Sequence, residues 1–83
     1  MIFVLLLNVA QSLNNLAIAR QEIGEYKVAK TLFEEALDLY LGVFQGNARA
    51  CSAELAALYN NLAGCLYQIV SRLASIYYVF RQL

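Results

Sequence analysis

Histidine is absent from this 83-residue sequence, cysteine occurs twice, and the acidic and basic side chains balance to a net charge of zero. Without histidine, two separated cysteines do not make the usual ligand set of a zinc site, so we expect no metal. If Cys51 and Cys65 lie on one helix, they are about 21 Å apart, too far for a disulfide. We expect two buried free thiols, no cofactor and a reducing, cytoplasmic setting.

Charged residues are also scarce, at 14% of the chain, and no run of like charges occurs. A nucleic-acid-binding surface carries a basic patch, so we expect no nucleic-acid partner. Glu34, Glu35 and Asp38 form an acidic patch, but no histidine, activated nucleophile or glycine-rich loop accompanies it. We interpret the patch as a solvated helix face, and expect no enzyme, no catalytic residue and no small-molecule substrate.

What the sequence has in excess is apolar residues, at 61% against the usual 45–50% or so. A chain of this length buries only somewhat more than about 60% of its unfolded surface. It cannot hide that much apolar surface within one small domain. We therefore expect further repeats, a second copy or a membrane to cover the remainder, and self-association through exposed apolar end faces is one form of this.

Gly24 divides the first half of the chain into two expected helices, residues 2–22 and 25–44. Leu13, Leu16 and Ala17 have the spacing of one helical face. Glycine tolerates the left-handed conformation that ends many helices, and a turn this short makes the two helices antiparallel neighbours. After the glycine, helical spacing resumes at Tyr26, Ala29, Phe33, Ala36, Leu37 and Tyr40.

This stretch resembles a tetratricopeptide repeat, a helix-turn-helix unit of about 34 residues, most closely the kinesin-light-chain type with its Leu-Asn-Asn-Leu-Ala opening. Two departures are Arg20, where an aromatic or leucine is usual, and Leu41, where many members have a proline. The resemblance implies an all-α fold, a short α-solenoid of about four helices. The matching residues are Leu16, Ala17, Gly24, Tyr26, Ala29, Phe33 and Ala36.

The second half of the chain repeats part of the first, because Leu58–Ala63 echoes Ser12–Ala17 at a spacing of 46 residues. We expect a break at Gly46 and Asn47, with Asn47 as an N-cap, and a third helix over residues 48–69. The echo then fails, and residues 71–83 are either a degraded fourth helix or a continuation of the third. The expected domain is residues 1–83, with a first pair over 1–44 and a degenerate second pair over 48–83.

The resemblance further implies a concave face, lined by the first helix of each pair, that binds a peptide segment of a protein partner. Asparagine offers donors and an acceptor to an extended backbone. On this basis we expect an interaction module or scaffold. The alternatives for the asparagines are a solvated surface or burial against a neighbouring unit. The candidate peptide-binding residues are Gln11, Asn14, Asn15, Ile18, Gln21, Asn60, Asn61 and Tyr67.

A membrane role is the second hypothesis. The apolar start, residues 1–7, has no basic residue and is too short for a signal peptide or a spanning helix. Residues 62–80 are apolar but carry Arg72 near their middle, which costs about 2.5–3.5 kcal/mol in a spanning helix. A small helical membrane protein using residues 62–80, and in addition residues 1–19, stays open. So does an inactive piece of a longer repeat protein.

Overall fold

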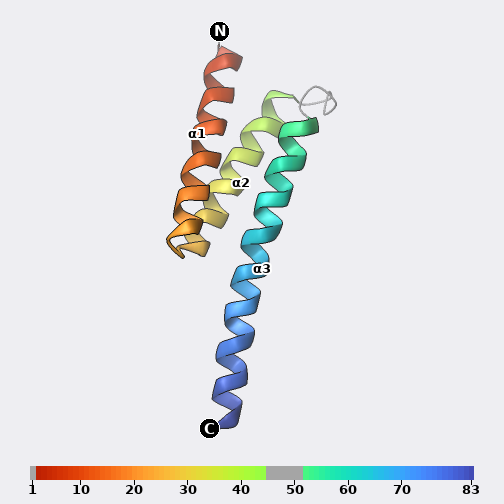
Figure 1. Cartoon of the computed structure of the whole chain (residues 1–83). Helices are drawn as coiled ribbons and strands as arrows, with labels where there is room; N and C mark the ends of the chain where they lie inside the picture. The colour runs from red at the N-terminus through yellow and green to blue at the C-terminus, as the bar shows by residue number, and fades with distance from the viewer. Residues whose placement is uncertain (1, 45–51) are drawn as a thin grey trace.

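The chain folds into three α-helices in the computed structural model, which describes residues 2–44 and 52–83 (Figure 1). They are α1 (Ile2–Glu22), α2 (Tyr26–Val43) and α3 (Ser52–Gln82). The first two form an antiparallel hairpin, and α3 packs against α2 while running in the same direction as α1. The all-α class and the first two helices are thereby confirmed.

The hairpin reverses at Gly24, which has φ +87°. Its amide donates to the Gln21 carbonyl at 3.0 Å, and the Glu25 amide donates to the Arg20 carbonyl at 2.9 Å. These two bonds are the Schellman arrangement that satisfies the last carbonyls of a helix. The Arg20 and Glu25 side chains close the same turn with an ion pair at 3.2 Å. Arg20, which departs from the tetratricopeptide pattern that the sequence resembles, therefore pairs with Glu25 across the turn.

Small residues form most of the core between the helices. Ala10 and Ala17 of α1 and Ala29, Phe33 and Ala36 of α2 are all fully buried and belong to one cluster. Alanine side chains let two helix backbones approach closely, so one aromatic ring suffices to fill the gap. The rest of the buried set comes from α2 and α3: Tyr40, Leu55, Leu58 and Cys65.

Leu16 is outside this core, with 44% of its surface exposed. The sequence placed it on the packing face beside Ala17, and that detail was wrong. Ala17 is fully buried, and the neighbouring position on a helix is turned away from it by about 100°. Leu13, which is half-buried, packs against the core instead.

The third helix is one unbroken rod of 31 residues, so residues 2–44 and 52–83 form three helices rather than about four. Residues 71–82 continue α3 and do not fold back to form a second pair. The helix continues because Val70 occupies the position that corresponds to Gly24 at the 46-residue spacing. No glycine or proline follows Val70 to end the helix. The expected break at Gly46 and Asn47, and residues 48–51, lie outside the described residues.

The last part of α3 extends past the hairpin turn, as Figure 1 shows at its blue end. The chain measures 58 × 22 × 15 Å, with a radius of gyration of 15.4 Å. A compact domain of this length has a radius of gyration of about 12 Å. We call residues 70–83 the distal arm, and every one of them is exposed.

A candidate peptide groove between α1 and α3

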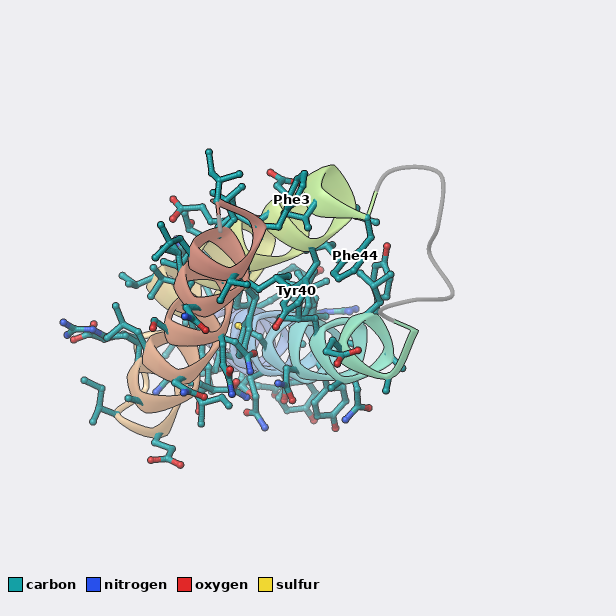
Figure 2. All side chains as sticks on the ribbon, turned by 90° about the horizontal axis from the view of Figure 1, so that it is seen from above. Phe3, Tyr40 and Phe44 are labelled. Atoms are coloured by element: carbon teal, nitrogen blue, oxygen red, sulfur yellow. The ribbon has the colours of Figure 1, made fainter. Side chains whose placement is uncertain are left out.

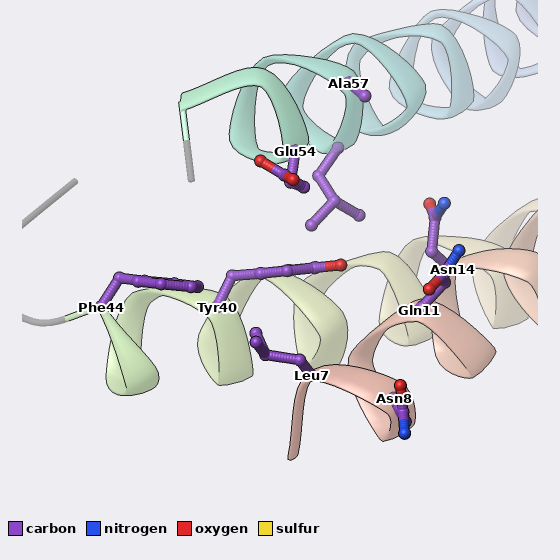
Figure 3. A pocket seen from close by; sticks show the side chains of 9 residues that line it. Leu7, Asn8, Gln11, Asn14, Tyr40, Phe44, Glu54 and Ala57 are labelled. Carbon is purple, nitrogen blue, oxygen red and sulfur yellow. The ribbon is translucent and has the colours of Figure 1, made fainter. Parts of the chain in front are cut away.

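Two hollows lie along the line where α1 and α3 approach each other. The upper one has a volume of about 370 Å³ and is open to solvent (Figure 3). Amides from α1 lie on one side of it, and the aromatic rings of Tyr40 and Phe44 lie along another. Seen from above, these two aromatic residues lie between the ends of the helices (Figure 2). The lining residues are Leu7, Asn8, Gln11, Asn14, Tyr40, Phe44, Glu54, Ala57 and Leu58.

The lower hollow has a volume of about 430 Å³ and lies nearer the Gly24 turn. It is more polar, because amide side chains come to it from both α1 and α3. Its apolar part consists of Ile18 and the ring of Tyr26. The lining residues are Ile18, Gln21, Glu22, Tyr26, Asn61 and Gln68.

An asparagine pair bridges α1 and α3 between the two hollows. The Asn61 Nδ2 donates to the Asn14 Oδ1 at 3.2 Å, and both side chains are half-buried. Asn14 lines the upper hollow and Asn61 lines the lower one. This bond engages one donor and one acceptor, so each amide keeps its other group for a further hydrogen bond. The pair therefore both joins the helices and presents polar groups to each hollow.

The α1 part of the expected peptide-binding set comes together in the structure. Gln11 and Asn14 line the upper hollow, while Ile18 and Gln21 line the lower one. Asn15, between them in sequence, is exposed and lines neither.

On α3, only one of the expected residues lines a hollow. Asn61 does so, while Asn60 and Tyr67 are exposed and lie outside both hollows. Relative to the expectation, α3 is rotated about its axis by about one residue position. Asn61 and Gln68 therefore face α1 in place of Asn60 and Tyr67.

Sequence reasoning missed the residues that build the upper hollow from outside α1. Tyr40 has the spacing of a core residue, and nothing in the sequence indicates that it also borders an opening. Phe44 and Glu54 lie at the end of α2 and the start of α3. Their meeting depends on how α3 crosses α2, which is a property of the tertiary packing.

Both hollows carry negative charge and no positive charge among their lining residues. Glu54 lines the upper hollow and Glu22 the lower one. Counted along the helices from the Asn14–Asn61 bridge, the two carboxylates are about 22 Å apart at 1.5 Å per residue. An extended chain covers about 3.3 Å per residue, so six or seven residues would span them.

Three polar contacts fasten α3 to the hairpin below the asparagine bridge. The Cys65 thiol donates to the Tyr26 carbonyl at 3.0 Å, and the Arg72 Nη1 donates to the Gly24 carbonyl at 3.4 Å. The Arg72 guanidinium also lies over the Tyr26 ring, 5.0 Å from its centroid, a distance that suits a cation–π interaction.

Cys65 is a buried free thiol, as expected, whereas Cys51 lies outside the described residues. Burial raises the pKa of the Cys65 thiol, although the positive charge of Lys30 and a backbone hydrogen bond at Lys30 act in the opposite direction. A thiol with a raised pKa is a poor nucleophile at neutral pH. Within residues 2–44 and 52–83, no group of three potential metal ligands occurs.

No protein-family model, no curated protein and no solved structure matches this chain. Among the described helices, one is long and apolar enough to cross a membrane, and it is α1. It overlaps residues 1–19 of the membrane hypothesis, whereas the segment 62–80 of that hypothesis does not meet the same criterion. Only 11% of the most apolar window of α1 is buried within the chain.

Proposed function

We propose that this chain is a protein-interaction module of tetratricopeptide-repeat type that binds a peptide segment along the groove between α1 and α3. The observation that carries the proposal is the alignment of Gln11, Asn14, Ile18 and Gln21 along two adjoining hollows. A helix pair followed by a third helix parallel to the first is the arrangement with which a helical-repeat stack begins. The groove is then the concave face of that stack.

The chemistry of the groove favours an extended peptide with apolar side chains inside it and positive charges at its ends. An aliphatic side chain fits against Leu7, Tyr40 and Leu58 in the upper hollow. The amides of Gln11 and Gln21 bond to the peptide backbone, which gives affinity without reading side chains. The carboxylates of Glu54 and Glu22 attract lysine or arginine and discourage acidic partners.

Selection from a random library of seven-residue peptides, followed by titration of the enriched sequences, tests this proposal. We expect enrichment of aliphatic residues between lysines or arginines. Replacing the terminal basic residues by glutamate should weaken binding about tenfold, since each exposed charge pair contributes up to about 1 kcal/mol. Failure to enrich any peptide, or enrichment of acidic ones, would contradict the proposal.

A matched pair of variants locates the binding face. Gln11→Ala with Gln21→Ala removes amides inside the hollows, and we expect a loss of affinity of about tenfold. Asn15→Ala with Asn60→Ala removes exposed amides from the same two helices outside the hollows, and we expect no change. If the second pair weakened binding as much as the first, the peptide would lie on another face.

Membrane association is the second candidate, and the observation that favours it is α1. This helix combines sufficient length with a mean hydropathy of 1.7 over its most apolar window. The apolar residues of its first turns, Ile2 to Leu5, are all exposed. Recovery of the protein in a membrane pellet after an alkaline wash would support this candidate against a freely soluble module. The third candidate is that the chain is a piece of a longer repeat protein.

A further inference from the structure

One face of α3 corresponds to the buried face of α1 but is left uncovered. On α1, which packs mainly against α2, Ala10 and Ala17 are fully buried and Leu13 is half-buried. The 46-residue spacing between the two halves of the chain assigns an equivalent face to α3. The three equivalent residues are all exposed, including 50% of Tyr59. In the same chain order they are Ala56, Tyr59 and Ala63.

This exposed face continues along α3 as an apolar seam. Its members recur at intervals of three and four residues, which places them along one side of the helix. Beyond the equivalents of the α1 residues, 39% of Leu66 and 62% of Val70 is exposed. Residues 2–44 and 52–83 therefore leave this side of α3 open to solvent. We call the set the α3 seam, and its members are Ala56, Tyr59, Ala63, Leu66 and Val70.

The α3 seam and the groove lie on opposite sides of α3. Gln68, which lines the lower hollow, is two positions from Leu66 and two from Val70. At about 100° per residue, it is turned by about 160° from both of them. Between these two sides lies the face with Leu58 and Cys65, which are buried against the hairpin. A ligand on the seam therefore leaves the groove free.

The helix that packs on the equivalent face of α1 is α2, which serves as a template for the occupant of the α3 seam. Its buried residues Ala29, Phe33 and Ala36 recur at intervals of four and three. Small side chains allow the backbones of two helices to approach closely, and an aromatic ring fills the remaining space. Because α2 runs antiparallel to α1 (Figure 1), the α3 seam fits an antiparallel helix with small residues on both sides of an aromatic one.

Charge favours an acidic helix as the occupant. Residues 55–82 of α3 include no acidic residue and carry Arg72 and Arg81. Arg81 follows Val70 by about three helical turns, so it is in line with the seam. A positively charged helix attracts an acidic partner, whereas the carboxylates of the groove attract a basic one. The template again agrees, because α2 has an exposed acidic patch of Glu34, Glu35 and Asp38.

We propose that the α3 seam is a docking site for an acidic amphipathic helix of a partner protein, which packs antiparallel to α3 as α2 packs on α1. The occupant presents a small, an aromatic and a small residue at intervals of four and three. The site is separate from the groove and takes a helix, whereas the groove takes an extended peptide. One chain thereby holds two partner segments of opposite charge and different conformation.

A synthetic peptide of residues 25–44, acetylated and amidated, is the probe. It carries the seam of α2 and a net charge of −2 from four acidic residues and two lysines, which makes it a poor ligand for the acidic groove. Fluorescence anisotropy with the full chain measures binding, and circular dichroism reports helix formation. We expect saturable binding that Val70→Glu in the chain weakens at least about tenfold, because a carboxylate replaces an apolar contact. Phe33→Glu in the peptide should weaken it similarly.

Ser71→Glu is the matched control. It adds the same charge at the next residue, which is exposed and is turned by about 100° from Val70 and about 140° from Leu66. It should leave binding of the helical probe unchanged. No binding at 200 µM would overturn the proposal, and so would equal weakening by the two glutamate variants. Binding that Val70→Glu does not weaken would mean that the peptide lies elsewhere or has displaced α2, and would overturn it equally.

Two further measurements test the other possible occupants of the seam. A dimer of the parent in sedimentation velocity that Val70→Glu dissociates would assign the seam to a second copy. Binding to phosphatidylcholine–phosphatidylserine vesicles that Val70→Glu abolishes would assign it to a membrane surface. Either result would overturn the proposal. The seven-residue groove peptides should bind the parent and Val70→Glu equally, which separates the outcome at this site from the outcome at the groove.

Discussion

Replacement of Gly24 by alanine should destabilise the fold for a reason confined to the backbone. An ideal Cβ at this position meets no atom within 4 Å, so there is no steric obstacle to the added methyl group. The φ of +87° is nevertheless a conformation that glycine adopts freely and an L-residue does not. The left-handed conformation costs about 1–2 kcal/mol for an L-residue, and the lower entropy of the unfolded alanine chain offsets about 0.4–1 kcal/mol of that.

We therefore expect Gly24→Ala to lower the free energy of unfolding by about 1 kcal/mol. In a domain of this size, that corresponds to a melting temperature lower by about 4–8 °C. Urea denaturation followed by circular dichroism measures the difference. Protein concentration must be the same for all variants, because association also contributes to apparent stability.

Two comparisons isolate the backbone as the cause. A chemically synthesised chain with D-alanine at position 24 should be more stable than the parent by about 0.4–1 kcal/mol, because a D-residue favours positive φ and also restricts the unfolded chain. Gly64→Ala makes the same change inside α3, where the new methyl group again has open space, and should stabilise by about 0.5–1 kcal/mol. Destabilisation of similar size by all three substitutions would refute the argument.

Two further predictions concern the contacts that fasten α3. Arg72→Ala should cost about 1–2 kcal/mol and Arg72→Lys less, since both lose the bond to the Gly24 carbonyl but lysine keeps a cation near the Tyr26 ring; equal stability of the parent and Arg72→Ala in urea denaturation would contradict this. For Cys65, the folded-state pKa is raised, so the stability that the neutral thiol contributes is complete below the unfolded pKa of about 8.5 and falls as pH rises through the folded value. The parent should accordingly lose more stability than Cys65→Ala between pH 8 and pH 10, and identical pH profiles for the two proteins would contradict the assignment.

The hairpin was predictable from the sequence because its signals are local. Gly24 ends one helix, and the spacing of Ala29, Phe33 and Ala36 defines the buried face of the next. Neither feature depends on distant residues. The place of Leu16 was not predictable in this way, since helical spacing alone does not distinguish the centre of a packing face from its edge.

The third helix shows where sequence reasoning ended. Its continuation through residues 71–82 was one of two open alternatives, and the absence of a glycine equivalent to Gly24 decides between them only in hindsight. Its rotation was harder to foresee. Apolar residues surround much of α3, so the pattern did not settle whether Asn60 or Asn61 faces α1. The contacts of Cys65 and Arg72 with the hairpin fix that choice, and both join residues far apart in the chain.

Those same contacts also fix how α3 is rotated about its own axis. Asn61, Cys65 and Arg72 lie four and seven residues apart on α3, and each bonds to the hairpin. A rotation of α3 about its own axis by one residue position would break all three bonds together. The rotational orientation of this helix is therefore fixed within the single chain. The direction in which the exposed apolar side chains at the C-terminal end of α3 face is therefore fixed before any partner binds.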